Sequence, residues 1–189
     1  YRREQLRHFE KLLNEPDSWR DYAEYFGASD RSEEGVWQAF FSKNEWVFGY
    51  GLDYRFNRVL QPQASISGTE ANGSSEVITD YLLGDKRYTT FVEIKKPSTP
   101  LFMGTINRSN SWKLSTDFIH SVSQILEQKA SGLIKFENRV HHDSLGNPIS
   151  QRAIDSKVVL IIGHWNQLES CSEKEKDVKM KTFELYRRD

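Results

Sequence analysis

The sequence predicts an α/β (α+β) fold in which helices flank a mixed central sheet. Segments with helical periodicity come first, a meander of short strands follows, and a further helix and strand complete the order. This order favours a layered domain with one sheet between helices. With 189 residues, 37% of them hydrophobic, the chain is long enough for one domain with a substantial core.

Three helical segments are expected before the first strand. Residues 1–14 place Leu6, Phe9, Leu12 and Leu13 at three- and four-residue spacing, and residues 15–30 form a second short helical piece that ends at Gly27. Ser32 has the character of an N-cap for a third helix over 33–44, whose first turn carries Glu33 and Glu34.

Three strands are expected next. Aromatic and β-branched residues predict one near 53–61, a flexible loop covers 65–75, and two further strands span about 76–83 and 87–96. A tight Gly84-Asp85 turn between the last two indicates a hairpin.

The second half of the chain alternates loops and regular elements. Residues 97–113 are expected to be a polar loop, and the segment from 114 to 134 has helical periodicity. After a loop-like stretch at 137–155, the apolar run at 157–165 is typical of a central buried strand. The charged C-terminal segment is expected to begin another helix.

Composition excludes several classes of protein. A single cysteine, Cys171, rules out an internal disulfide framework and suits a reducing compartment, so we expect a cytoplasmic protein. No apolar run approaches the roughly 20 residues that cross a bilayer, so no membrane partner is expected. The net charge of −1 neither supports nor excludes nucleic-acid binding.

The candidate site lies in the predicted hairpin. Glu93 and Lys95 are two residues apart, so their side chains leave the same face of the strand, and the hairpin can bring Asp80 near Glu93. Two carboxylates, with the backbone carbonyl of Ile94, are suitable oxygen ligands for Mg²⁺ (or Mn²⁺). Lys95 would stabilise negative charge on a phosphate, which makes this a hydrolytic set for a phosphodiester. A solvated strand surface with alternating charges is the competing interpretation, and spacing alone leaves both open.

Two helical residues flank this set. Glu34 would be an outer metal ligand, although a first-turn glutamate also simply stabilises a helix start. Gln124 would orient the attacking water or hold a phosphate, although a glutamine at a helix boundary needs no function.

The loop after the second hairpin strand carries candidate nucleic-acid contacts. Arg108 and Lys113 would contact phosphates, and Trp112 would stack on an unpaired base. A solvated loop with one anchoring aromatic residue explains them equally well. Lys96, at the end of the preceding strand, would extend the basic surface, although a charge in such a place is usually just solvated. The pair His141-His142 followed by Asp143 is not expected to bind metal, because adjacent histidines point apart and no second cluster has zinc-ligand spacing.

The Asp…Glu-x-Lys arrangement resembles that of the PD-(D/E)xK nuclease superfamily, which has the restriction-endonuclease-like fold. More specifically, four ordered segments resemble the nuclease domain of Shedu anti-phage defence proteins: EEGVWQAFFSKNEWVFGYG, ITDYLL, FVEIKKPSTPLF and VSQILEQ. The resemblance runs from about Glu33 to about Trp165. The proline of the superfamily name is absent, because Thr79 precedes Asp80.

The resemblance implies Mg²⁺- or Mn²⁺-dependent cleavage or nicking of DNA in bacterial immunity. By position, Asp80 and Glu93 are metal ligands, Lys95 is the catalytic lysine, Glu34 is the helix-borne acid and Gln124 is the glutamine of the following helix. It further implies a homo-oligomer and other domains in the same protein. We therefore expect a helical segment at 1–30 and a nuclease domain at 31–189, truncated at its C-terminal edge, where another strand is expected.

Two other functions remain open from the sequence. One is a catalytically inactive nuclease-like domain, used for nucleic-acid binding or oligomer assembly, in which the carboxylates are vestigial. The other is a nuclease that acts on RNA, although nothing in the sequence resembles an RNA-reading module.

Overall fold

The computed structural model describes residues 1–15, 17–49, 58–65, 78–84, 88–108, 111–138 and 140–188. Within these ranges the helices are, in chain order, α1 (Arg2–Asn14), α2 (Trp19–Tyr25), α3 (Glu33–Lys43), α4 (Thr116–Asn138) and α5 (Glu173–Arg188), with short 3₁₀ turns η1 (Glu45–Gly49) and η2 (Trp165–Leu168). The strands are β1 (Arg58–Ser65), β2 (Ile78–Gly84), β3 (Tyr88–Ile94), β4 (Phe102–Ile106), β5 (Trp112–Leu114) and β6 (Arg152–Ile161).

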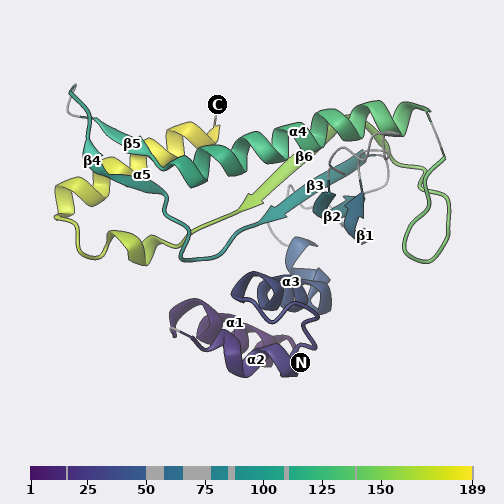
Figure 1. Cartoon of the computed structure of the whole chain (residues 1–189), viewed down its shortest axis with the longest axis horizontal. Helices are drawn as coiled ribbons and strands as arrows, with labels where there is room; N and C mark the ends of the chain where they lie inside the picture. Colours follow the sequence, from purple (N-terminus) through teal and green to yellow (C-terminus); the bar gives the residue numbers. More distant parts are fainter. Residues whose placement is uncertain are drawn as a thin grey trace.

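The main sheet has the order β1-β2-β3-β6. The first three strands are antiparallel neighbours, and β6 joins β3 in parallel after the chain has crossed through α4. The predicted mixed sheet flanked by helices is therefore confirmed. In Figure 1, α4 runs along one face of this sheet, whereas α1, α2 and α3 form a separate layer on the other.

Local sequence explains where the N-terminal helices begin and end. Gly27, which follows the C-cap residue Phe26 of α2, has φ of 61°, a left-handed conformation that glycine adopts readily at a helix C-terminus. The Ser32 side chain accepts a hydrogen bond from the backbone N–H of Gly35, as expected of the N-cap of α3. All three predicted N-terminal helices are thus present.

Each face of the sheet packs against its own layer of helices. Tyr81, Leu83, Val92 and Ile94 join the core formed with α1, α2 and α3, which includes the fully buried Val36. The opposite face contributes Leu60, Ala64, Leu82 and Phe91 to a smaller core, against which Phe136 of α4 packs. This alternation follows from the two-residue period of a strand.

Two predictions for individual elements are wrong. The segment at 97–113 is not only a loop, because β4 and β5 form a second, two-stranded antiparallel sheet there. The apolar run at 157–165 is not a central strand: β6 ends at Ile161 and lies at the edge of the described sheet, with half-buried side chains from Val158 to Ile161.

The remaining expectations for regular elements stand with adjusted bounds. The strand expected near 53–61 is present as β1, which begins at Arg58; its predicted start, the loop at 65–75 and the turn after Gly84 lie mainly outside the described residues. The helix after residue 114 and the C-terminal helix are present as α4 and α5.

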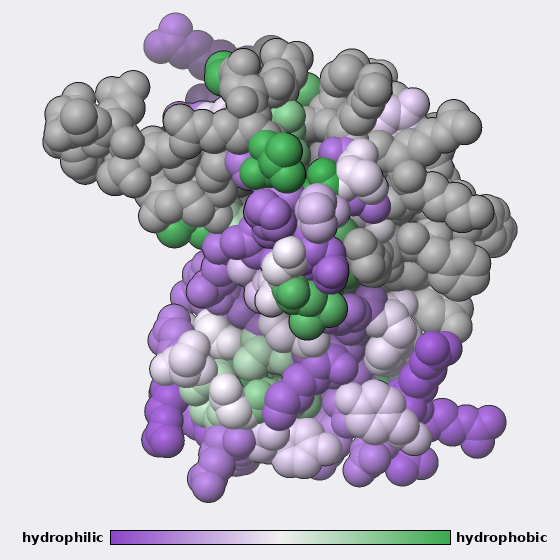
Figure 2. All heavy atoms as spheres, turned by 90° about the vertical axis from the view of Figure 1, so that its right-hand side faces the viewer, coloured by the Kyte–Doolittle hydropathy of each residue, from purple (hydrophilic) through white to green (hydrophobic). Residues whose placement is uncertain are grey.

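The described surface is largely polar at the end of the molecule where β1 and β2 lie. Among the residues drawn in colour in Figure 2, hydrophilic side chains are widespread and the hydrophobic patches are separated from one another. None of the helices in the described part of the chain combines the length and the apolar character that crossing a bilayer requires.

Candidate functional site

The β2–β3 hairpin brings Asp80 against the backbone of β3. The regular antiparallel pairing of β2 with β3 ends at Tyr81, which lies opposite Val92. Beyond these residues the two strands are joined by hydrogen bonds between side chains and backbone. The Thr79 hydroxyl donates to the carbonyl of Val92 at 2.9 Å, and the Ile94 N–H donates to Asp80 Oδ2 at 2.7 Å. The Asp80 carboxylate is therefore fixed beside the residue that separates Glu93 from Lys95.

Glu93 is buried on the α4 side of the sheet, with 3% of its side chain exposed. Its Oε1 accepts hydrogen bonds from Lys95 Nζ at 2.7 Å and from Gln124 Nε2 at 2.6 Å. Its Oε2 accepts one from Gln128 Nε2 at 2.7 Å. This burial does not fit the alternative of a solvated strand surface, since a solvated carboxylate has no need of three protein donors.

Asp80 carries a strongly perturbed carboxyl group. Burial, followed by the negative charge of Glu93, raises the pKa of Asp80 from 3.8 to about 7, although the hydrogen bond from Ile94 and the charge of Lys95 oppose the rise. Its Oδ1 accepts a hydrogen bond at 2.7 Å from the Gln38 amide, which α3 supplies. Two carboxylates thus repel each other in a partly desolvated site.

Lys95 follows β3 directly and has 23% of its side chain exposed. Burial by itself would lower the pKa of Lys95. The hydrogen bond and charge of Glu93, with the charges of Glu34 and Asp80, outweigh this effect and raise it. The side chain is accordingly an ammonium group at neutral pH.

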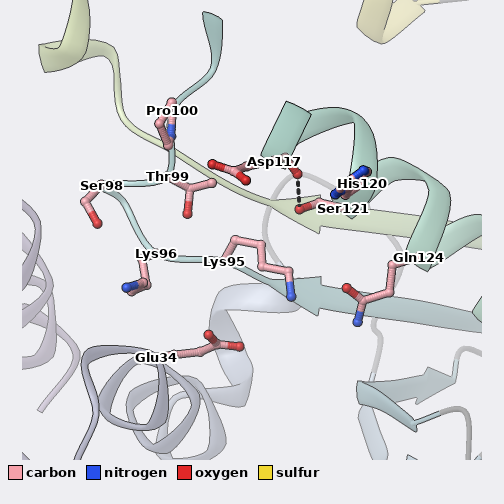
Figure 3. A pocket seen from close by; sticks show the side chains of 10 residues that line it. All are labelled: Glu34, Lys95, Lys96, Ser98, Thr99, Pro100, Asp117, His120, Ser121 and Gln124. Carbon is pink, nitrogen blue, oxygen red and sulfur yellow. Dashed lines mark hydrogen bonds between the residues drawn. The ribbon is translucent and has the colours of Figure 1, made fainter. Parts of the chain in front are cut away.

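A cavity of about 410 Å³ opens beside Lys95. Figure 3 shows Glu34 of α3 pointing toward Lys95 from one wall, while Gln124 of α4 extends from the opposite wall. Lys96 and the hydroxyl-bearing Ser98 also line this cavity. All five residues predicted as catalytic therefore lie around the end of β3.

The donor set fits a hard divalent cation. Asp80 and Glu93 offer carboxylate oxygens, and the charge of Glu93 raises the pKa of Asp80, so a cation between them would relieve their repulsion. In the described part of the chain, no group of three or more His, Cys, Asp or Glu side chains is arranged to hold a metal. Such a cation would therefore take its remaining ligands from carbonyl groups, water and substrate, as Mg²⁺ commonly does.

The predicted nucleic-acid contacts are dispersed. Lys96 lines the cavity at Lys95, whereas Arg108, Trp112 and Lys113 are not among its lining residues. Trp112 and Lys113 belong to β5, and Arg108 lies just beyond β4. The Nζ atom of Lys179 lies 3.8 Å from the ring centroid of Trp112, so one face of the indole is already covered.

Two glutamines of the site were not predicted from the sequence. Gln38 binds Asp80, and Gln128, with 1% of its surface exposed, binds Glu93. Each follows a predicted residue by four positions on the same helix: Gln38 follows Glu34, and Gln128 follows Gln124. The spacing of one helical turn places each glutamine on the same helix face as a predicted residue, which is the sequence signal for them, but a glutamine at such a position is more often solvated.

Comparison with known proteins gives two related findings. The family described as "Shedu protein SduA, C-terminal" matches residues 31–189, which is most of the chain. A curated relative, Shedu protein SduA of Bacillus cereus (strain B4264), is 24% identical over 164 residues, which cover 84% of this chain. The chain spans about 40% of the length of that relative.

Proposed function

The chain belongs to the Shedu SduA C-terminal family, and from this premise we propose that it is a metal-dependent nuclease that cleaves or nicks DNA in defence against phage. The observation that carries the proposal is the convergence of the carboxylates of Asp80 and Glu93 with the ammonium group of Lys95. Perturbed charged groups gathered beside a cavity are typical of active sites.

Asp80 and Glu93, with the carbonyl of Ile94, would hold Mg²⁺ or Mn²⁺. When bound, such an ion lowers the pKa of water and neutralises charge on a scissile phosphate. Each Asp80 oxygen accepts one protein hydrogen bond from the groups described above, so each retains a lone pair for a cation. On Glu93 the oxygen with remaining capacity is Oε2, because Oε1 already accepts two hydrogen bonds.

The other residues would act directly on substrate or water. Lys95 would stabilise the negative charge that develops on the phosphate, since its side chain lines the cavity. Gln124 would hold the attacking water or a phosphate oxygen through its amide. Glu34 would receive a proton or orient a water from the opposite wall.

Further DNA contacts would come from Lys96, Arg108, Trp112 and Lys113. Of these, Lys96 has the strongest structural support, because it lines the same cavity as Lys95. We further propose that the rest of a longer protein, and other copies of the chain in a homo-oligomer, select the substrate. The 40% coverage of the Bacillus relative supports the existence of such additional regions.

A second candidate function is that of a binding or assembly domain that does not catalyse cleavage. The hydrogen bonds on Glu93 favour it, because three protein donors already satisfy most of the lone pairs of this carboxylate. Isothermal titration with Mn²⁺ separates the two candidates, since a vestigial site would bind the ion weakly or not at all.

The direct test compares wild-type protein with Lys95→Ala and Glu93→Ala on supercoiled plasmid and linear DNA, with Mg²⁺ or Mn²⁺. We expect metal-dependent cleavage by the wild type and a loss of at least about 100-fold in Lys95→Ala, with folding and DNA binding retained. Lys181→Ala, which removes an exposed lysine of α5, is the matched control. Full cleavage by Lys95→Ala would contradict the role assigned to this lysine.

A further inference from the structure

Gln128 contacts the candidate site from a position that is buried from solvent. It lies on α4 one turn beyond Gln124, and only 1% of its surface is exposed. Its single amide nitrogen donates to Glu93 Oε2 at 2.7 Å and to the carbonyl of Ile78 at 2.8 Å. One buried side chain thus joins the strand that carries Asp80 to the strand that carries Glu93.

The orientation of this amide is determined by its partners. Both neighbours of the nitrogen are acceptors: a backbone carbonyl and a carboxylate. If the amide were turned over, its oxygen would face these two acceptors and repel both, so the nitrogen must occupy this position. The chemistry of the two neighbouring acceptors therefore requires Gln128 to be the donor.

This orientation leaves the other end of the amide without a protein partner. Gln128 Oε1 is buried and accepts no hydrogen bond from the described residues. Buried polar atoms are normally satisfied, and unsatisfied ones concentrate at functional sites. The amide nitrogen thus holds Ile78 and Glu93 in place, whereas the amide oxygen of the same side chain forms no hydrogen bond with the described residues.

We infer that Gln128 is a positioning residue that sets both the orientation of Glu93 and the separation between the two metal-binding carboxylates. The inference rests on the proposed function and extends it to a residue that touches neither metal nor substrate. Gln124 and Lys95 hold Oε1, so Gln128 is the described side chain that fixes Oε2, the oxygen with capacity left for a cation. Its bond to Ile78 also anchors β2 two residues before Asp80.

The test measures Mn²⁺ binding by isothermal titration in the whole chain, and it compares the wild type with Gln128→Met and Gln128→Asn. Methionine keeps the length and volume of the side chain but cannot donate, whereas asparagine keeps the amide but is too short to reach both acceptors. We expect Gln128→Met to weaken Mn²⁺ binding by about 10- to 100-fold, as is usual when a partner of a metal ligand is removed. Gln128→Asn should also weaken it.

Gln5→Met is the matched control, because Gln5 of α1 is also buried, at 3% exposed, and accepts a hydrogen bond from Asn44 in the N-terminal helical layer. A purely structural effect of losing a buried glutamine would appear in both Met variants as a lower unfolding temperature. Only a positioning role raises the Mn²⁺ concentration needed for half-maximal cleavage while the rate at saturating Mn²⁺ recovers.

The outcomes separate this inference from the proposed function. Wild-type Mn²⁺ affinity in folded Gln128→Met and Gln128→Asn would overturn the positioning role, even if the protein is a nuclease. If Gln128→Met does not fold at the assay temperature, Gln128→Asn alone decides the matter. If instead the wild type binds Mn²⁺ no better than Glu93→Ala does, the proposed function itself fails.

Discussion

The negative charge of Asp80 lowers the free energy of unfolding of the metal-free protein. Its carboxyl has a pKa of about 7 in the folded chain, against an ordinary value of 3.8, because it is buried beside Glu93. Between these values the folded state holds a proton that the unfolded state has released, so the free energy of unfolding falls as pH rises through this window. A shift of this size corresponds to a destabilisation of up to about 4 kcal/mol at pH 8.

Asp80→Asn is therefore expected to stabilise the metal-free protein at pH 8, by about 1–3 kcal/mol, while it abolishes cleavage. The amide can still accept from Ile94, and Gln38 can turn its own amide to match. At pH 5 the gain should largely vanish, because Asp80 is already protonated there. Urea unfolding at the two pH values measures the difference.

Asp177→Asn serves as the control, since Asp177 is an exposed residue of α5. It should change the free energy of unfolding by less than about 0.5 kcal/mol at either pH. A stabilisation by Asp80→Asn that is equal at pH 5 and pH 8 would show that the carboxyl is not protonated near neutrality.

The sequence identifies the charged residues of the site better than the neutral ones. Asp80, Glu93 and Lys95 can be found because strand periodicity and a hairpin determine which side chains meet. Gln38 and Gln128 could not be found in this way, because a glutamine on a helix is usually a solvated residue. Only the packing of both helices onto the sheet shows that these amides face carboxylates.

At the scale of the element, the first turn of α3 packs very closely against the residues that precede the helix. Gly35 lies in its first turn, and a Cβ atom built there would lie 2.1 Å from the backbone carbonyl oxygen of Asp30. Real Cβ atoms do not approach backbone this closely, so the start of α3 would have to shift. Since α3 carries Glu34 and Gln38, this contact helps to set one wall of the site.

We expect Gly35→Ala to lower the free energy of unfolding by at least about 2 kcal/mol and to reduce cleavage, although Gly35 contacts no substrate in the proposed mechanism. Gly104→Ala is the matched control, because a Cβ atom on Gly104 of β4 would meet nothing within 4 Å. Thermal unfolding of the two variants compares them directly. Equal unfolding temperatures would mean that the start of α3 adapts without strain.

Lys179 joins α5 to the β4–β5 hairpin. Only 8% of its side chain is exposed, its Nζ lies 2.7 Å from Glu175 Oε1, and the same ammonium group covers the ring of Trp112. Truncating this buried lysine would remove its ion pair and its contact with the Trp112 ring together. This lysine therefore belongs to the packing of the second sheet.

Lys179→Ala is expected to lower the free energy of unfolding by roughly 1–3 kcal/mol, because a buried side chain and its contact with Trp112 are lost, and to increase amide hydrogen exchange in β4 and β5. Lys181→Ala, on the exposed side of the same helix, should do neither. Faster exchange that is spread evenly over the whole chain would argue against a local role for Lys179.

The elements that were mispredicted share a physical cause. β4 and β5 are only five and three residues long, and exposed side chains predominate in β4, so their sequences are too short to show the alternation that marks a half-buried strand. The last four residues of β6, Val158 to Ile161, are all apolar, which predicts a strand buried on both faces, yet in the described structure β6 has β3 on one side only. Burial pattern predicts that a segment is a strand more reliably than it predicts the neighbours of that strand.

At the scale of the whole molecule, the candidate site lies where the two layers of helices meet across the sheet. Asp80 receives its hydrogen bond from α3, and Glu93 receives two from α4, on the opposite face. The two carboxylates are thus held by separate layers, each with its own hydrophobic core. Their mutual repulsion therefore opposes the packing of both helical layers onto the sheet.

A divalent cation should therefore stabilise the whole fold. At a free concentration about 100 times its dissociation constant, binding to the folded state alone adds about 2.7 kcal/mol, which corresponds to a rise of roughly 5–10 °C in unfolding temperature for a chain of 189 residues. We expect this rise with Mn²⁺ in calorimetry of the wild type and its loss in Glu93→Gln. The rise should be larger at pH 8 than at pH 6, because Asp80 must release its proton to bind the ion. An equal rise in Glu93→Gln would place the cation elsewhere on the molecule, away from Asp80 and Glu93.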